Sequence, residues 1–172
     1  MESRFTILGH ALHPILIVFP FGLLATAVIF DLIYLVTRTE QWSIISFWLI
    51  AGGIIGGIVA AVPGVIDWWA IPANTRAKSV GMIHGIGNVA VIILFLISWL
   101  FRRDKGSGYE MAGVPGTLAL FFSFAGIVLA LFTGWLGGEL IERLGVSVHD
   151  GANLNAPNSL TNNSLEKVKI SK

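Results

Sequence analysis

Four long apolar stretches constrain the fold of this chain more strongly than any other feature of its sequence. They cover residues 14–37, 43–66, 80–101 and 115–138. Each is long enough for a transmembrane helix, which needs about 20 residues to cross roughly 30 Å of hydrocarbon. Only 12% of the residues are charged, whereas soluble domains carry roughly a quarter. The sequence therefore predicts an all-α integral membrane protein, folded as a four-helix bundle in the lipid bilayer.

The number of spans also sets the domain organisation. Four spans place both termini on the same side of the membrane, and we expect residues 1–148 to form one transmembrane domain. Residues 149–172 are rich in Asn and Ser, so they cannot bury enough apolar surface to offset the entropy of ordering, and we expect a disordered polar tail. Lys and Arg near the spans are evenly divided between the two sides, which leaves the membrane orientation open.

Composition excludes several classes of function. A net charge of +1 argues against a nucleic-acid surface. The chain has no cysteine, which excludes disulfides, iron–sulfur clusters and thiol catalysis within it. The sequence contains no catalytic-triad order, phosphate-binding glycine loop or kinase signature. We therefore expect a protein that is not an enzyme on its own, with its ligands or partners in or beside the bilayer.

Rows of small residues run along the second and fourth spans. In lipid, small residues spaced four apart let helix backbones approach closely. Such rows predict tight helix crossings, a homo-oligomer built through the glycine-rich faces, or a smooth wall beside a flat cofactor. The rows are Gly52, Gly56 and Ala60, then Gly53, Gly57 and Ala61, and finally Gly126, Ala130, Gly134 and Gly138.

Two histidines precede the first span and a third lies inside the third span. Pro14 suits the first turn of a helix and disfavours helical conformation in the residue before it, so we expect His13 at the N-cap. His10 lies on the same membrane face. His84 lies about five residues inside its span, roughly 7 Å deep at 1.5 Å per residue, with Asn88 one turn deeper. Polar groups at such depth usually face the bundle interior and have a partner, which makes His84 the leading functional candidate.

Charged residues add to the end of the protein that carries the histidines. Asp67 and Arg76 lie in the loop between the second and third spans, and Glu139 follows the fourth span. Asp31 lies about 26 Å along the first helix, near the opposite membrane surface. We expect Asp31 to reach that surface or to pair with Arg38.

Two kinds of metal centre fit these residues. Imidazoles from two helices can ligate a b-type haem from opposite faces. His13 and His84 are the first candidates for this role and His10 is their substitute, while Asn88 and Arg76 would contact the cofactor, Arg76 by holding a propionate.

The other kind is a directly ligated metal ion. Because imidazole suits Zn, Fe and Cu, any of the three is a candidate for a site built from His10, His13, His84 and Asp67. The spacing of these residues is not diagnostic for one metal.

Transport and a purely structural role are the remaining alternatives. A proton or ion relay would have to join the histidines to Asp31, and only Asn88 lies between them, so we do not expect a continuous relay. In the structural alternative, an ion pair between Asp67 and Arg76 closes a loop, and the polar groups fasten helices in a non-catalytic membrane subunit or scaffold. Among these readings the sequence favours a small membrane redox or metal-binding protein.

The segments that carry these residues resemble a known family. They read HALHPILIVFPFGLLATAVIFD, AVPGVIDWWAIPANTRAK, HGIGN and GWLGGELIERLGVSV, in this order along the chain. Over about residues 8–148 the chain resembles the bacterial membrane proteins of the domain of unknown function 2231 family. The motif positions of that family fall on His10, His13, Pro14, Asp31, Gly64, Asp67, Arg76, His84, Asn88, Gly137 and Gly138.

The resemblance implies a location and a type of partner. It implies a four-helix protein of the bacterial inner (plasma) membrane. Some relatives carry a fused Rieske-type iron–sulfur domain, which implies a redox partnership. Because this chain has no cysteine, a Rieske-type partner would have to be a separate protein.

Overall fold

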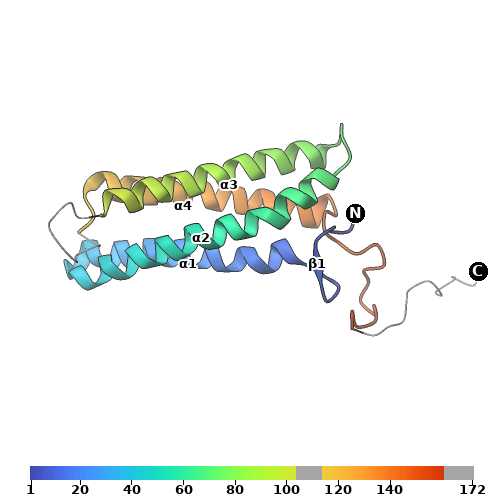
Figure 1. Cartoon of the computed structure of the whole chain (residues 1–172), viewed down its shortest axis with the longest axis horizontal. Coiled ribbons are helices and arrows are strands. Elements are labelled where there is room, and N and C mark those ends of the chain that lie inside the picture. Colours follow the sequence, from blue (N-terminus) through green and yellow to red (C-terminus); the bar gives the residue numbers. More distant parts are fainter. Residues whose placement is uncertain (104–113, 161–172) are drawn as a thin grey trace, which may run out of the picture.

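The computed structural model describes residues 1–103 and 114–160, and it confirms the all-α four-helix bundle (Figure 1). All four helices are long and apolar enough to cross a membrane. They are α1 (Leu12–Thr37), α2 (Glu40–Ala70), α3 (Arg76–Phe101) and α4 (Thr117–Gly138). A π-helical turn, η1 (Glu139–Arg143), prolongs α4, and two short strands, β1 (Thr6–Ile7) and β2 (His10–Ala11), form an antiparallel hairpin before α1.

α1, α2 and α3 extend beyond the apolar stretches from which they were predicted, whereas α4 begins at Thr117, two residues inside its stretch. α1 begins at Leu12 with Ala11 at its N-cap, so the predicted N-cap position of His13 was wrong. The first turn of a helix leaves its N–H groups without intrahelical acceptors, and Pro14 is tolerated there without marking the boundary. α2 continues to Ala70 and ends just before Pro72, because a residue that precedes proline is disfavoured in the helical region.

The helices pack mainly as two hairpins, α1 against α2 and α3 against α4. Glycine permits the close approach in each. A Cβ added at Gly53 would lie 2.5 Å from Leu24 Cδ2, and one added at Gly126 would lie 2.8 Å from Phe95 Cε2. The small-residue rows therefore serve tight crossings within the chain, as predicted, and a homo-oligomer through these faces stays a prediction.

An apolar core joins the two hairpins. On α1 it lies between the level of His13 and the level of Asp31. Residues from all four helices contribute to it. Its buried members are Leu24, Ala27, Val28, Ile50, Ile54, Val91, Phe95 and Ala130.

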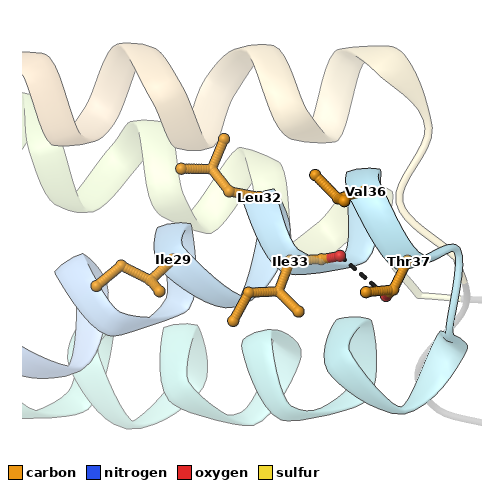
Figure 2. Close-up of a pocket in the computed structure, with 5 residues that line it drawn as sticks. All are labelled: Ile29, Leu32, Ile33, Val36 and Thr37. Carbon is orange, nitrogen blue, oxygen red and sulfur yellow. Dashed lines mark hydrogen bonds between the residues drawn. The ribbon is translucent and has the colours of Figure 1, made fainter.

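The outer surface of the bundle is apolar. Figure 2 shows a shallow hollow on α1 that is lined by Ile29, Leu32, Ile33, Val36 and Thr37. The one hydroxyl in this hollow, on Thr37, donates a hydrogen bond to Ile33 O at 2.9 Å (Figure 2). A surface whose backbone and side-chain polar groups are satisfied within the helix suits contact with lipid chains.

The N-terminus and the segment after η1 lie at the same end of the bundle (Figure 1). The N-terminal ammonium donates to Gly145 O at 3.0 Å, and His149 Nε2 lies 3.3 Å from a carboxylate oxygen of Glu2. Residues 149–160 of the predicted tail are therefore adjacent to residues 1–11. Residues 161–172 lie outside the described part, and the disorder of the tail stays a prediction.

Candidate functional site

Two histidines face each other inside the bundle, one from each hairpin. His13 lies in the first turn of α1, and His84 lies on α3. Their ring centroids are 6.4 Å apart, and the ring planes are nearly perpendicular at 89°. Both side chains are half-buried. The structure thus brings together the two imidazoles that the sequence placed first among the candidate ligands.

A backbone carbonyl of the neighbouring helix orients each imidazole. His13 Nδ1 lies 2.8 Å from Ala60 O on α2, and His84 Nδ1 lies 2.9 Å from Thr133 O on α4. A carbonyl oxygen can only accept, so each Nδ1 carries a proton and donates it. In the neutral form of such a ring Nε2 keeps its lone pair, which is how histidine is usually prepared to bind a metal.

A glycine four residues beyond each carbonyl makes room for the imidazole. A Cβ added at Gly64 would lie 2.9 Å from both Cε1 and Nδ1 of His13. A Cβ added at Gly137 would lie 3.1 Å from Cε1 of His84. Contacts this short are not tolerated without movement of the ring. Glycine at these two positions therefore allows each imidazole to lie directly against the neighbouring helix.

His84 has a second set of contacts that His13 lacks. Asn88 lies one turn deeper on α3, and its Nδ2 donates to His84 Nε2 at 3.0 Å. The Thr133 hydroxyl donates to Asn88 Oδ1 at 2.9 Å. These directions agree with a neutral His84 whose proton is on Nδ1. The prediction that Asn88 shares a face with His84 is confirmed.

The other predicted metal ligands are engaged elsewhere. His10 is exposed in the β hairpin, and its Nδ1 lies 3.2 Å from Leu8 O. Asp67 is only 5% exposed, and it accepts hydrogen bonds from the Ser3 hydroxyl and the Arg4 backbone N–H. Within residues 1–103 and 114–160, no group of three or more His, Asp or Glu side chains is placed to hold a metal ion.

The expected ion pair between Asp67 and Arg76 was wrong. Arg76 donates instead to Glu139 Oε1 at 2.6 Å and so joins the start of α3 to η1. The Arg76 side chain is 62% exposed, so the pair contributes little to stability. The Asp67 carboxylate instead accepts hydrogen bonds from the N-terminal segment. Arg76 as a cofactor contact stays a prediction.

A buried ion pair lies at the opposite end of the bundle, and sequence reasoning missed it. Arg102 donates from Nη1 and Nη2 to the two carboxylate oxygens of Asp31, at 2.7 and 2.6 Å. Both side chains have zero exposure. The expected pairing of Asp31 with Arg38 was wrong, because Arg38 is the left-handed C-cap of α1 and follows the helix end. Two parallel N–H···O bonds make this the strong form of an arginine–carboxylate contact.

Three serines satisfy the remaining donors of Arg102. Its Nε donates to Ser98 Oγ at 3.2 Å, its Nη1 to Ser46 Oγ at 3.2 Å and its Nη2 to Ser123 Oγ at 2.8 Å. With Asp31, the cluster takes side chains from all four helices. A buried charge is tolerated when it is both paired and hydrogen-bonded in this way.

A signal for this ion pair is present in the sequence. Asp31 follows His13 at the same spacing at which Arg102 follows His84. Because the structure places the two histidines at the same level, the two helices carry opposite charges at the same depth. Arg102 directly follows the third apolar stretch. If it is assigned to the following loop, its equal spacing with Asp31 from the two histidines goes unnoticed.

The comparison with known families agrees with the fold. The family model described as "Predicted membrane protein (DUF2231)" matches residues 9–150. This range contains the four helices, the histidine pair and the buried ion pair. No curated protein and no solved structure matches the chain. The chain is therefore an integral membrane protein that belongs to the DUF2231 family.

Proposed function

We propose that this protein is a small membrane redox protein that holds one b-type haem between His13 and His84. The observation that carries the proposal is the histidine pair, with each Nδ1 committed to a backbone carbonyl. Bundle cofactors are commonly held by inward side chains on facing helices. Here the two ligands come from different hairpins, so one cofactor would join both halves of the bundle.

The number of protein ligands favours haem over a bare metal ion. Structural zinc sites take four protein ligands, whereas the described residues hold no group of three acidic or histidine side chains. A haem needs only axial ligands from the protein, because the macrocycle supplies the rest. His13 and His84 would hold the haem iron from two helices, and their ring centroids lie 6.4 Å apart.

The chain's own residues would orient the ligands and limit access to them. Ala60 O and Thr133 O fix the two ring orientations, and Asn88 has to release His84 Nε2 before that nitrogen can bind. The apolar core below the pair keeps water from the opposite membrane surface away. When bound, a haem supplies one-electron chemistry.

The cellular setting of this activity follows from the family resemblance. We expect a bacterial inner membrane location and exchange of electrons with a separate protein, for which a Rieske-type protein is the candidate. The histidine pair lies toward the end of the bundle that carries the N-terminus and the segment after η1 (Figure 1), so we expect that partner to approach this end. His10 and Asp67 as ligands of Zn, Fe or Cu stay predictions.

An absorption spectrum tests the proposal directly. The protein is purified in detergent from cells with adequate haem and metal supply, and spectra are recorded before and after dithionite, with metal analysis on the same sample. We expect a Soret band that shifts and sharpens on reduction, with about one haem per chain. His13→Ala and His84→Ala should each abolish the band.

His10→Ala is the matched control, because His10 is exposed and its Nδ1 lies 3.2 Å from Leu8 O in its own hairpin. It should retain the wild-type spectrum. A wild-type protein with no band and no stoichiometric metal would refute the redox proposal. Loss of the band in His10→Ala, with retention in His13→Ala, would refute the assignment of the ligands.

A non-catalytic membrane subunit is the second candidate, and one observation favours it. The contacts from Thr133 to Asn88 and from Asn88 to His84 form a closed network that needs no ligand. In this case the polar groups only fasten helices. The two histidines would then differ, because His84 has more partners than His13: His84→Ala should lower the melting temperature more than His13→Ala, and neither should change any spectrum.

A further inference from the structure

We infer that the α1–α2 and α3–α4 hairpins are two versions of one structural unit, and that Asp31 and Arg102 make each hairpin bind the other in preference to a copy of itself. The inner face of each hairpin is thus an interaction surface whose partner is the matching face of the other. This inference does not depend on whether a cofactor is bound.

The histidine contacts give the first match between the hairpins. In each hairpin the imidazole Nδ1 donates to a carbonyl of the neighbouring helix, from His13 at 2.8 Å and from His84 at 2.9 Å. The glycine that faces the ring lies four residues beyond that carbonyl in both hairpins. The step in the sequence from His13 to His84 therefore relates α1 to α3. The step from Ala60 to Thr133, which is two positions longer, relates α2 to α4.

A second match lies deeper in the bundle, and it follows from the same two steps. Leu24 and Phe95 follow their respective histidines at equal spacing, and each is the side chain that faces a glycine on the neighbouring helix. Those glycines, Gly53 and Gly126, are separated by the same step as the two carbonyls. A close glycine contact between the two helices is therefore made at the same level in both hairpins.

The third match lies at the end of the bundle opposite the histidines. There the matched side chains differ in charge but are equally buried. Asp31 and Arg102 are related by the step between the two histidines, and they bind each other across the two hairpins. The positions around them obey the same two steps, and all have zero exposure. These matched positions are Ala27 with Ser98, Ser46 with Ala119, and Ile50 with Ser123.

Matching positions that face each other imply a two-fold relation between the hairpins. α1 and α3 run in the same direction, so the axis of this relation lies along the bundle, as in membrane proteins with parallel internal repeats. His13 meets His84 near one end of the axis, and Asp31 meets Arg102 near the other. A residue on the axis therefore always meets its own counterpart.

That geometry explains why the charges must differ. If the α1–α2 hairpin bound a copy of itself, Asp31 would face Asp31; the α3–α4 hairpin would place Arg102 against Arg102. Two like charges at zero exposure are strongly unfavourable. The three serines add to the selectivity, because they satisfy the arginine side only: their counterparts Ala27, Ile50 and Ala119 are apolar.

The first test exchanges matched residues within the full chain. One variant carries Asp31→Arg with Arg102→Asp. A second variant also exchanges the residues around the charges, so that the whole cluster is rotated about the two-fold axis. The added substitutions are Ala27→Ser, Ser98→Ala, Ser46→Ala, Ala119→Ser, Ile50→Ser and Ser123→Ile. Melting temperatures are measured in detergent by the fluorescence of the native tryptophans.

The exchange of the whole cluster should melt within about 5 °C of the wild type. The exchange of the charges alone should melt lower, because the arginine introduced by Asp31→Arg would lack hydroxyl acceptors. A whole-cluster exchange that melts below the charge exchange, or that does not fold, would overturn the inferred relation between the hairpins.

The second test examines partner choice and uses two full-length chains with different affinity tags. The Asp31→Arg chain has arginine in both hairpins, and the Arg102→Asp chain has aspartate in both. Neither should give a folded monomer when expressed alone. Expressed together, they should co-purify as a one-to-one complex in which each hairpin has found its opposite charge in the other chain.

Differently tagged wild-type chains are the control: their charges are satisfied internally, so their co-purification measures any association through other faces, and the two variants should co-purify well above that level. Folded monomers of either single variant, or failure of the two variants to associate, would overturn the role of the ion pair in partner choice.

Discussion

Glycine at positions 64 and 137 decides how closely each histidine can lie to the neighbouring helix. Each glycine faces an imidazole ring, at 2.9 Å for Gly64 and 3.1 Å for Gly137 from an added Cβ. The ring cannot retreat without losing the hydrogen bond from its Nδ1 to the backbone carbonyl. The pair of glycines is therefore part of the histidine site, although neither carries a side chain.

We predict that Gly64→Ala and Gly137→Ala each destabilise the protein by about 1–3 kcal/mol, the usual cost of overpacking. Gly64→Ala should have the larger effect, because its contact is shorter. Gly85→Ala is the control: no atom lies within 4 Å of its added Cβ, so it should be neutral or stabilise α3 by about 0.5–1 kcal/mol. Thermal unfolding in detergent measures all three, and equal melting temperatures would contradict the steric argument.

At the scale of single residues, the sequence predicted local partners better than distant ones. Asn88 was expected beside His84 because four residues separate them on one helix, and the structure agrees. Asp31 was expected to reach the membrane surface or pair with Arg38, and its partner is Arg102. Helical spacing is a local property, whereas a contact between α1 and α3 depends on how the helices are rotated and packed. Depth along each helix was the only guide available for the second case.

Among the elements, α2 is joined to the segment before the β1–β2 hairpin by one buried carboxylate. Asp67, near the end of α2, accepts hydrogen bonds from the Ser3 hydroxyl and from the Arg4 backbone N–H, the latter at 2.8 Å. It thereby fixes the segment that leads into His10 and His13. The function of Asp67 in this structure is thus to attach the N-terminal segment to the bundle.

We predict that Asp67→Ala loosens this segment and accelerates trypsin cleavage after Arg4. Loss of the hydrogen bonds, at about 1.5 kcal/mol, should raise the open population and the cleavage rate roughly tenfold. Glu142→Ala removes an exposed carboxylate at the same end of the bundle, so it serves as the control and should leave the rate unchanged. Intact-mass analysis over time measures the cleavage. Equal rates in the two variants would show that the segment is held by other contacts.

The elements themselves were largely predictable, because their signals are long and repeated. The four apolar stretches became four helices, and the glycine rows became close crossings. The ends of the helices were less predictable: α2 runs from Glu40 to Ala70, beyond its apolar part on both sides. Hydropathy predicts which residues lie in the hydrocarbon layer, whereas the end of a helix is set by a proline or a capping residue.

At the scale of the whole molecule, two polar levels in the described part of the bundle are separated by apolar side chains. The histidine pair forms one level and the cluster of Asp31 and Arg102 forms the other, with the apolar core between them. Proton movement along the bundle would need hydrogen-bonding groups through this core. The arrangement is therefore unfavourable for proton movement along the bundle axis.

We predict that the wild-type protein does not conduct protons. Proteoliposomes that hold the protein should keep an imposed pH gradient as long as protein-free vesicles do, as followed with a pH-sensitive dye in the lumen. Vesicles with added gramicidin, a proton-conducting channel, provide the positive control. A faster decay with protein than without it would contradict the prediction and restore transport as a candidate function.

Asn88 has a consequence for how the protein is made. Because its amide occupies His84 Nε2 and is itself held by Thr133, the chain can leave the insertion machinery with its most deeply placed imidazole already satisfied. Under the haem proposal, folding therefore need not wait for the cofactor. Under the same proposal, the incoming cofactor would compete with the Asn88 amide for His84 Nε2.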